Sequence, residues 1–530
     1  MEQEHGMIPV DGASGHGRTA TLLRALYILS LGMMLAWLAW KVYLLLSLPG
    51  IEARELANVT AILQLRDHSF NTLEAYPQNI YLYGTLQAWL LSWLPGWNDV
   101  MLNRLCSFAC MLCSAVPLLL AASRLAHLAE LRMDQGVLSL FAGCYILPFL
   151  IEIPFSLGTP NFMGLLLANS ILWLALQRFR GRHALAGLLL VGCFLTKQYF
   201  LLAALYVILY NLLLCPWKKA VCNISLTGAV ALGGCALCFL SDQVYYSFVH
   251  HIVDADCAKK RALRKFGMYA MYVLPMVLPA AMMAGGIMVR WWRKGWRAAV
   301  DTVRTSLRTR VFLCAAVSVL AVSLVLVKVG GHSGALEQLY FTQLLTPPLL
   351  LLCFLLQLRR NTVAGRVWIA LLLAGGTAWH ALQSQQEERE AIQTQRAVMA
   401  MYAGDLESGA SVRGCCTTAF YHAANGLPIT ENGQQQYVDT IWQADKGVDW
   451  AKQRLLPYLG KNRLVEEELV EGIRAGSWQV IYTDSCTYMP ASAQKELQKH
   501  YSLSSSCISA FPGFKTELKR WELQPENTPN

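Results

Sequence analysis

A polar and aromatic stretch at residues 48–104 separates the first two apolar segments of the chain, and it holds the residues best suited to chemistry. Glu52 follows directly after the first apolar segment. A carboxylate there is expected at a bilayer surface, where a lipid headgroup and a water-soluble molecule could both reach it. The stretch therefore predicts a carboxylate that could act as a general base at the membrane surface.

Tyrosines and tryptophans follow the carboxylates in the same stretch. Tyr76 precedes Pro77, and Tyr83 lies in the run YLYGTLQAWLLSWLPGW, which ends at Trp97. The pattern predicts an amphipathic helix in the headgroup layer, because the rings of Tyr and Trp favour that depth. These rings could also stack on a sugar, although headgroup anchoring explains most of the set.

Other polar groups within the apolar part of the chain are expected on the same side. They are the turn Thr159-Pro160-Asn161, the pair Lys197-Gln198, and the segment from His332 to Tyr340. The Lys197-Gln198 pair is predicted to break the chain between the apolar runs Ala184–Leu195 and Tyr199–Leu214. A transporter would instead need polar groups near the middle of the membrane, often in broken helices. Glu152 is the main exception, and it lies near the outer end of its apolar run. The distribution favours chemistry at one membrane surface.

Length and composition predict the elements that must position these groups. The chain has 530 residues, of which 55% are hydrophobic and 15% are charged. This balance is typical of a polytopic α-helical membrane protein. Counting the apolar runs that are long enough to cross a hydrocarbon core predicts about 11 transmembrane helices. The first runs from Ala25 to Leu48 and the last from Val367 to Leu382.

Positive charges predict the orientation. The formal net charge of +10 comes mostly from short loops between apolar runs, so we attribute it to membrane insertion and expect no nucleic-acid partner. A cytoplasmic N-terminus puts nearly all basic clusters inside the cell. These clusters are Arg124/Arg132, Arg178 to Arg182, Lys218/Lys219, Arg290 to Arg310 and Arg359/Arg360. The cluster from Lys259 to Lys265 is the exception, and binding to anionic membrane lipid would explain its position on the outer side.

An odd number of spans makes residues 383–530 a small extracytoplasmic α/β domain. Helices are predicted at Gln385–Met401, Trp450–Ile473 and Ala491–His500, and strands at Trp478–Thr483 and Thr516–Leu523. Residues 1–382 form the transmembrane domain, with a first outer loop at 49–102. Cysteines of the exported part could form disulfides, with a pairing that the sequence does not fix. They are Cys415, Cys416, Cys486 and Cys507.

Five stretches together resemble the membrane-embedded GT-C superfamily of glycosyltransferases, in particular the group of bacterial protein O-mannosyltransferases and aminoarabinose transferases. The resemblance covers about the first 360 residues, and the C-terminal part resembles small exported domains of some bacterial members. The stretches are Glu52-Ala53-Arg54, Tyr76-Pro77 with the tryptophan-rich run, Asn103 to Ser107, Thr159-Pro160-Asn161 with Leu195 to Gln198, and Gly330 to Gly334 with Tyr340.

The resemblance implies an inverting sugar transfer from a polyprenyl-phosphate-linked donor to a hydroxyl of a lipid, glycan or protein acceptor. It implies Glu52 as the general base, with Glu55 in reserve. The alternative for Glu52 is a helix cap or an ion pair with Arg54. The implied phosphate-binding cations are Lys197, Arg54 and Arg104, and Lys197 could instead snorkel to the interface. The implied sugar or acceptor contacts are Tyr76, Tyr83, Asn161, Gln198, His332 and Tyr340, of which His332 could equally be a plain loop residue.

Two departures from the family pattern bear on metal binding. Ile51 stands where many relatives have Asp, and Asn161 stands where relatives often have Asp. A divalent metal site that uses those acids is thereby put in question, and no metal ligand is assigned.

Two further hypotheses belong to other classes. One is a non-enzymatic polytopic protein, either a transporter or a scaffold that presents the exported domain. The other is a ligase or polymerase of lipid-linked oligosaccharide with the same architecture.

Overall fold

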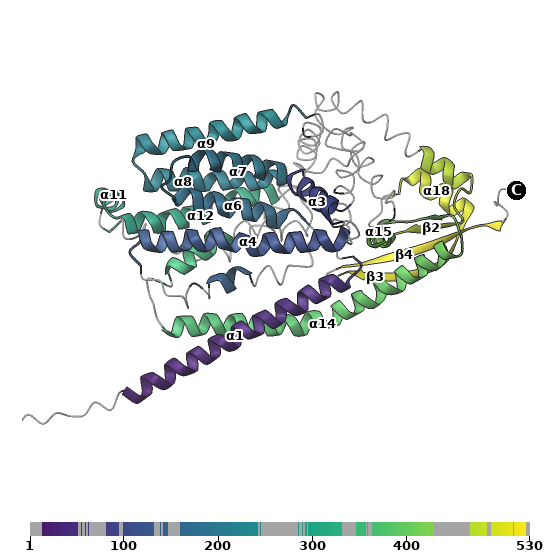
Figure 1. Cartoon of the computed structure of the whole chain (residues 1–530), viewed down its shortest axis with the longest axis horizontal. Coiled ribbons are helices and arrows are strands. Elements are labelled where there is room, and N and C mark those ends of the chain that lie inside the picture. The colour runs from purple at the N-terminus through teal and green to yellow at the C-terminus, as the bar shows by residue number, and fades with distance from the viewer. Residues whose placement is uncertain are drawn as a thin grey trace, which may run out of the picture.

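The computed structural model shows a long helical bundle with a small sheet at one end (Figure 1). It describes residues 13–50, 81–94, 99–131, 141–146, 159–241, 295–330, 346–356, 363–425, 467–484, 489–511 and 514–525, and single residues or pairs at 55, 59, 62, 138, 244, 285, 289, 292–293, 358 and 427. The named helices are α1 (Ala13–Ser47), α3 (Tyr81–Trp93), α4 (Asp99–Leu128), α6 (Asn161–Leu176), α7 (Arg182–Thr196), α8 (Ala204–Leu214), α9 (Trp217–Cys238), α11 (Trp296–Thr305), α12 (Leu307–Gly330), α14 (Val363–Glu407), α15 (Cys416–Ala424) and α18 (Ala491–His500).

The bundle is built by helices that pack against one another in pairs. Helix α4 packs on α6, α6 on α7, and α7 on α9, while α8 packs on both α9 and α12. Buried alanines, among them Ala121 and Ala122 of α4, let helices approach closely, and leucines such as Leu118 and Leu125 fill the space between them. Leu165 and Ile171 of α6 are fully buried against this core.

The predicted break at Lys197 is confirmed. Helix α7 ends at Thr196, Lys197 is extended with φ −161°, and a 3₁₀-helix η1 (Gln198–Ala203) leads into α8. The backbone therefore places Lys197 between two helical segments of the bundle.

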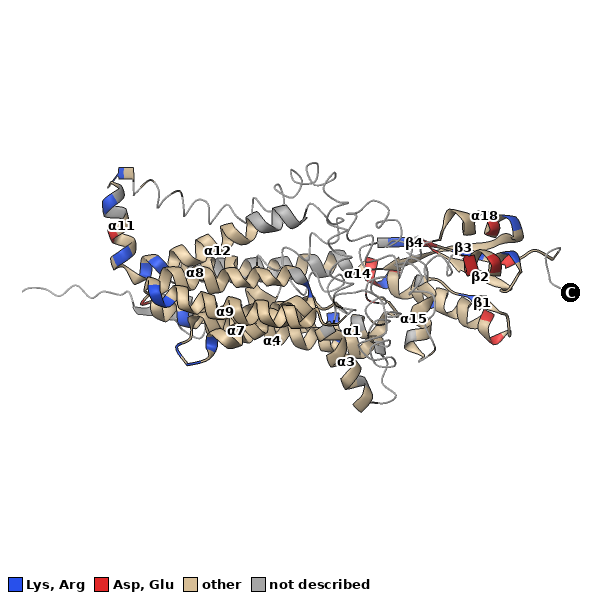
Figure 2. Cartoon of the chain, turned by 90° about the horizontal axis from the view of Figure 1, so that it is seen from above, with Lys and Arg blue, Asp and Glu red and all other residues tan. Residues whose placement is uncertain are grey.

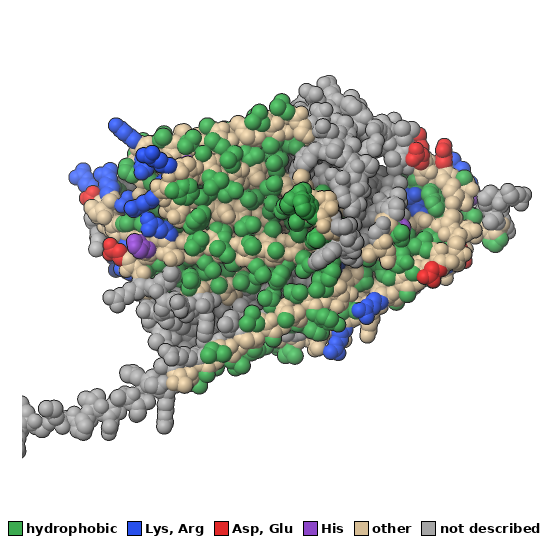
Figure 3. Space-filling view, in the orientation of Figure 1, with side chains coloured by type: hydrophobic (Ala, Val, Ile, Leu, Met, Phe, Trp, Pro, Cys, Tyr) green, Lys and Arg blue, Asp and Glu red, His purple; other side chains and the backbone are tan. Residues whose placement is uncertain are grey.

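Two of the described helices are long and apolar enough to cross a membrane, Val100–Leu128 and Trp217–Cys238. Hydrophobic side chains cover the face that α4, α7 and α9 form together (Figure 3). Leu188 of α7 and Leu232 of α9 belong to the exposed large apolar residues, with 58% and 74% of their surface accessible. An apolar face of this extent is typical of a surface that contacts lipid or another protein.

Charged residues are arranged lengthwise along the molecule. Figure 2 shows Lys and Arg gathered at one end of the bundle, around α11 and the loops between bundle helices, and the sheet at the opposite end. Helices α1 and α14 run in the same direction, from the basic end toward the sheet (Figure 1).

Helix α14 is continuous over 45 residues. The sequence predicted a last span that ends at Leu382 and a separate helix at Gln385–Met401, but the structure shows one helix across both. The predicted domain boundary at 382/383 therefore falls inside α14. A buried ion pair between Lys41 of α1 and Glu388 of α14 joins the two helices near this point.

The sheet has four strands in the order β1-β2-β4-β3, where β1 (Val412–Arg413) is parallel to β2 (Val480–Thr483). Strands β3 (Tyr501–Phe511) and β4 (Phe514–Leu523) form an antiparallel hairpin, and β4 pairs antiparallel with β2. Val480 and Tyr482 pack against the α14 side, whereas Ile481 packs against the α18 side, as alternation along a strand requires.

The predicted strands at Trp478–Thr483 and Thr516–Leu523 and the helix at Ala491–His500 are confirmed. Residues 467–474 are helical and overlap the end of the predicted helix Trp450–Ile473, whose earlier residues lie outside the described ones. Strand β3 was missed.

Two of the cysteines that could form disulfides, Cys415 and Cys507, are free thiols in the structure. Burial raises the pKa of the Cys415 thiol well above its usual value, which makes it unreactive. Cys486 and the side chain of Cys416 lie outside the described residues.

Candidate functional site

A buried ion pair lies where the bundle meets the sheet. The guanidinium of Arg104 donates from Nε to Oε1 of Glu55 at 2.5 Å and from Nη2 to Oε2 at 2.9 Å. The side chains of Arg104 and Glu55 are 4% and 0% exposed. A two-point geometry of this kind fixes both side chains, and it offsets the cost of removing them from water.

The same guanidinium fixes the end of α1. Arg104 Nη1 donates to the carbonyl of Leu48 at 2.7 Å, and Nη2 lies 3.4 Å from the carbonyl of Pro49. These carbonyls follow the last turn of α1, where no further helical N–H can reach them. Arg104 therefore ties the start of α4 to the chain segment that leaves α1.

Helix α14 and the sheet fix the next residue. The Gly50 N–H donates to Oε1 of Gln395 at 2.9 Å, and Nε2 of Gln395 donates to the carbonyl of Ala510 in β3 at 2.9 Å. A Cβ on Gly50 would lie 2.5 Å from the ring of Phe420 in α15. Glycine is needed here because the backbone passes so close to that ring.

A pocket of about 270 Å³ opens beside this anchored segment. Leu48 and Pro49 of the α1 end, Met101 and Arg104 of α4, and Phe420 of α15 contribute to its wall. Its lining combines many apolar side chains with a few polar ones, which is typical of sites that bind organic ligands.

A second polar group lies at the first turn of α6. The hydroxyl of Tyr199 donates to Oδ1 of Asn161 at 2.6 Å, and Nζ of Lys197 lies 5.6 Å from the centre of the Tyr199 ring. Asn161 is fully buried, and among the described residues its Nδ2 amide has no hydrogen-bond partner. The group thus combines a cation, a buried N–H donor and the positive end of a helix dipole.

Helix α4 connects the two groups. Ser107, three residues after Arg104, donates to the carbonyl of Thr159 at 3.3 Å, just before α6 begins. Asn103 lies one turn before Ser107, and its Oδ1 accepts a hydrogen bond of 2.8 Å from the hydroxyl of Tyr83. Tyr83 is fully buried, so its ring fixes α3 against α4 and is not open to a ligand.

The predicted site residues fall into three sets. The structure joins Glu55 to Arg104 and Asn161 to Tyr199 beside Lys197, whereas it gives Tyr83 a packing role. The residues outside the described ones are Glu52, Arg54, Tyr76, His332 and Tyr340, together with the side chain of Gln198, whose backbone begins η1.

The sequence analysis missed three residues that fix this region, Gln395, Lys41 and Glu388. Lys41 and Glu388 are both buried, at 2% and 5% side-chain exposure. Lys41 could have been found from the sequence, because a single Lys within an apolar run must be paired with an anion or hydrated. Nothing local in the sequence singles out Gln395.

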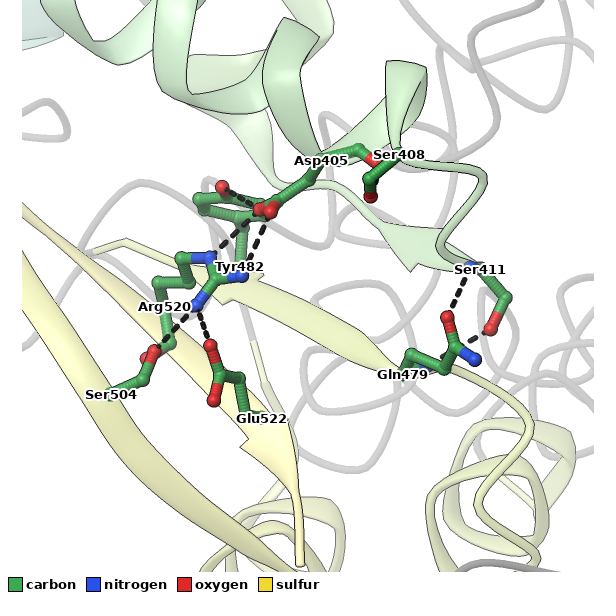
Figure 4. Close-up of polar contacts among 8 residues, drawn as sticks. All are labelled: Asp405, Ser408, Ser411, Gln479, Tyr482, Ser504, Arg520 and Glu522. Carbon is green, nitrogen blue, oxygen red and sulfur yellow. Dashed lines mark hydrogen bonds and ion pairs between the residues drawn. The ribbon is translucent and has the colours of Figure 1, made fainter.

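A polar network holds the far end of α14 to the sheet (Figure 4). The guanidinium of Arg520 in β4 donates from Nε and Nη2 to the carboxylate of Asp405, each at 2.8 Å, and the hydroxyl of Tyr482 also donates to Asp405. Hydrogen bonds from Arg520, and then from Tyr482, lower the pKa of Asp405 against the opposing effect of burial. This network lies where the end of α14 meets the sheet.

Within the described part of the chain, no three His, Cys, Asp or Glu side chains come together as a metal site. Comparison with models of known protein families and with curated proteins gives no match for the chain.

Proposed function

We propose that the chain is a polytopic membrane glycosyltransferase. It transfers a sugar, with inversion, from a polyprenyl-phosphate-linked donor to a hydroxyl of a lipid, glycan or protein acceptor. Glu52 acts as the general base, and the reaction takes place at the outer face of the plasma membrane.

The observation that carries the proposal is the anchored segment Leu48–Gly50. Three elements hold it: α4 through Arg104, α14 through Gln395, and α15 through the ring of Phe420. Chain connectivity keeps the Cα atom of Glu52 within about 7 Å of that of Gly50. A segment fixed this firmly beside a pocket supports a role in positioning a reacting group.

The reaction assigns a separate role to each charged group. The acceptor oxygen attacks the anomeric carbon of the sugar while its proton passes to the Glu52 carboxylate, and the bond from that carbon to the phosphate oxygen breaks. The polyprenyl phosphate leaves with the electron pair. Glu55 holds Arg104 in place, so both are positioning residues for the Leu48–Gly50 segment.

The group at α6 is suited to the leaving phosphate. Lys197 supplies a positive charge, Asn161 supplies a buried amide donor, and the first turn of α6 adds backbone N–H groups. Donors that are in place before the reaction stabilise a developing anion without further reorganisation.

The membrane placement has its own support. The wide apolar face of the bundle and the two helices long enough to cross a membrane favour embedding. The gathering of Lys and Arg at the end opposite the sheet favours a cytoplasmic basic end and an outer sheet domain. The shared direction of α1 and α14 agrees with an odd number of crossings up to α14.

A transfer assay on the full chain in phosphatidylcholine vesicles tests the proposed donor. We expect product, detected by mass, from prenyl-phosphate sugars and none from the same sugars carried on nucleotides. Lys197→Gln should lower the rate by about a hundredfold or more, as loss of one stabilising donor does in other enzymes. Lys495→Gln, an exposed cation of α18, is the matched control and should leave the rate unchanged. Equal rates from both donor types, or an unchanged rate for Lys197→Gln, would argue against the assignment.

A further inference from the structure

Exposed aromatic rings stand beside exposed cations at the end of the bundle opposite the sheet. Phe179 lies between Arg178 and Arg180 in the loop before α7, and Trp217 directly precedes Lys218 and Lys219 at the start of α9. Phe179 is 48% exposed and Trp217 is 70% exposed. We call residues 178–180, 217–219, 292–293 and 295–308 the basic collar.

The third segment of the collar repeats this pattern. Trp292 is 91% exposed and is followed by the exposed Arg293. Three separate segments of the chain thus bring a large ring and at least one cation to the same end of the molecule. Cations that serve only to orient a membrane protein require no such rings beside them.

Helix α11 gives the collar its shape. Figure 2 shows α11 running across the end of the bundle, whereas α4, α7 and α9 run along it. Arg297 and Arg304 of α11 and Arg308 at the start of α12 are exposed, while Val300 and Val303 of α11 are half-buried. Helix α11 is amphipathic, and its exposed charged residues are Arg297, Asp301 and Arg304.

This geometry fits the headgroup layer of a membrane. A largely exposed aromatic ring has a lower free energy in the interfacial region of a membrane than in water. Cations at the same depth attract anionic headgroups. An amphipathic helix that lies across the bundle end has the orientation of a helix in the plane of the interface.

We propose that the basic collar binds anionic phospholipid headgroups, with α11 lying in the plane of the membrane surface at that end. The proposal rests on the membrane placement inferred above, and it does not depend on sugar transfer.

Lipid retention by the full chain tests this proposal. The chain is reconstituted in vesicles of phosphatidylcholine and phosphatidylglycerol, extracted in mild detergent, and the lipids that stay bound are identified by native mass spectrometry. We expect phosphatidylglycerol to be enriched over its share in the vesicle. The triple variant Arg297→Gln/Arg304→Gln/Arg308→Gln should lower this enrichment about tenfold or more, because each cation near a surface attracts anionic lipid independently.

Three exposed lysines of the sheet region provide the matched control, Lys495→Gln/Lys499→Gln/Lys515→Gln. This variant loses the same charge and should retain phosphatidylglycerol like the parent. Equal retention by both triple variants, or no preference over phosphatidylcholine in the parent, would overturn the proposal. Selective retention by a chain that transfers no sugar would support the collar and refute the proposed activity.

Discussion

Arg104 and Glu55 form a buried ion pair where the bundle meets the sheet, whereas the described cations of the basic collar at the opposite end are exposed. Arg104 and Glu55 are almost inaccessible and fix one backbone segment beside a pocket. Arg297 and Arg304 of the basic collar face outward from α11. Burying charge is costly unless every partner is in place, and this need fits the positioning role that we propose for the Arg104–Glu55 pair. The exposed end is suited to binding a diffuse, mobile partner such as a lipid surface.

The buried pair between α1 and α14 should give the largest effect on stability. Lys41→Met leaves Glu388 buried without its cation, and we expect this to lower the free energy of unfolding by about 3–5 kcal/mol. Adding Glu388→Leu should recover most of that loss, since no unpaired charge then remains. Thermal unfolding in detergent measures both. A double variant as unstable as the single one would show that the pair does not hold the two helices.

The contact between Gly50 and Phe420 should give an intermediate effect. Gly50→Ala places a methyl group against the ring, and we expect a loss of about 1–3 kcal/mol from overpacking together with a lower transfer rate. Gly404→Ala of α14 is the control, because a Cβ there meets nothing within 4 Å. Adding Phe420→Leu to Gly50→Ala should restore part of the loss. No difference between the two glycine variants would contradict the close approach.

The network at Asp405 should give a smaller and pH-dependent effect. Its pKa in the folded chain lies below the ordinary value of 3.8, so its contribution to stability is present above that value and is lost as the pH falls through the folded pKa. We expect Asp405→Asn to cost about 1 kcal/mol at neutral pH, because the pair with Arg520 is partly exposed. As the pH falls below the folded pKa, the variant and the parent should converge. Unfolding curves across this range measure the difference, and a gap that widens toward acid would contradict the assigned sign.

The basic collar should give the smallest effect on stability. Arg297→Gln removes an exposed cation with no buried contact, so we expect a change within about 0.5 kcal/mol. The same thermal unfolding measurement applies. A loss as large as that of Lys41→Met would mean that the collar supports the fold, which would undo the contrast between the two ends.

Local patterns in the sequence predicted much of the fold. The segment Trp478–Thr483 was predicted as a buried strand and Thr516–Leu523 as a strand from its alternation, and the polar pair Lys197-Gln198 predicted the break between two bundle helices. Strand β3 was missed because Ser502 to Ser506 carry mostly small polar side chains, without the β-branched and aromatic residues that mark strands. Its pairing with β4 supplies the stability that its own residues do not.

Long-range contacts were beyond the sequence. Gln383 to Glu390 was taken as the start of a separate domain, but its Gln and Glu residues favour helix and continue α14. The partner of Lys41 lies 347 residues away in the chain, so no spacing rule could find it. The partners of Arg104 are also distant in the sequence. Arg104 was predicted to bind a phosphate, and the structure shows its guanidinium bound to Glu55 and to the end of α1.

The most direct test compares Glu52→Gln with Glu55→Gln in the vesicle transfer assay, with thermal unfolding measured in parallel. We expect Glu52→Gln to lower the transfer rate about a hundredfold or more at unchanged stability, because only the proton acceptor is lost. Glu55→Gln should lower both rate and stability, because Arg104 loses its charged partner. Transfer by Glu52→Gln at the rate of the parent would contradict the account.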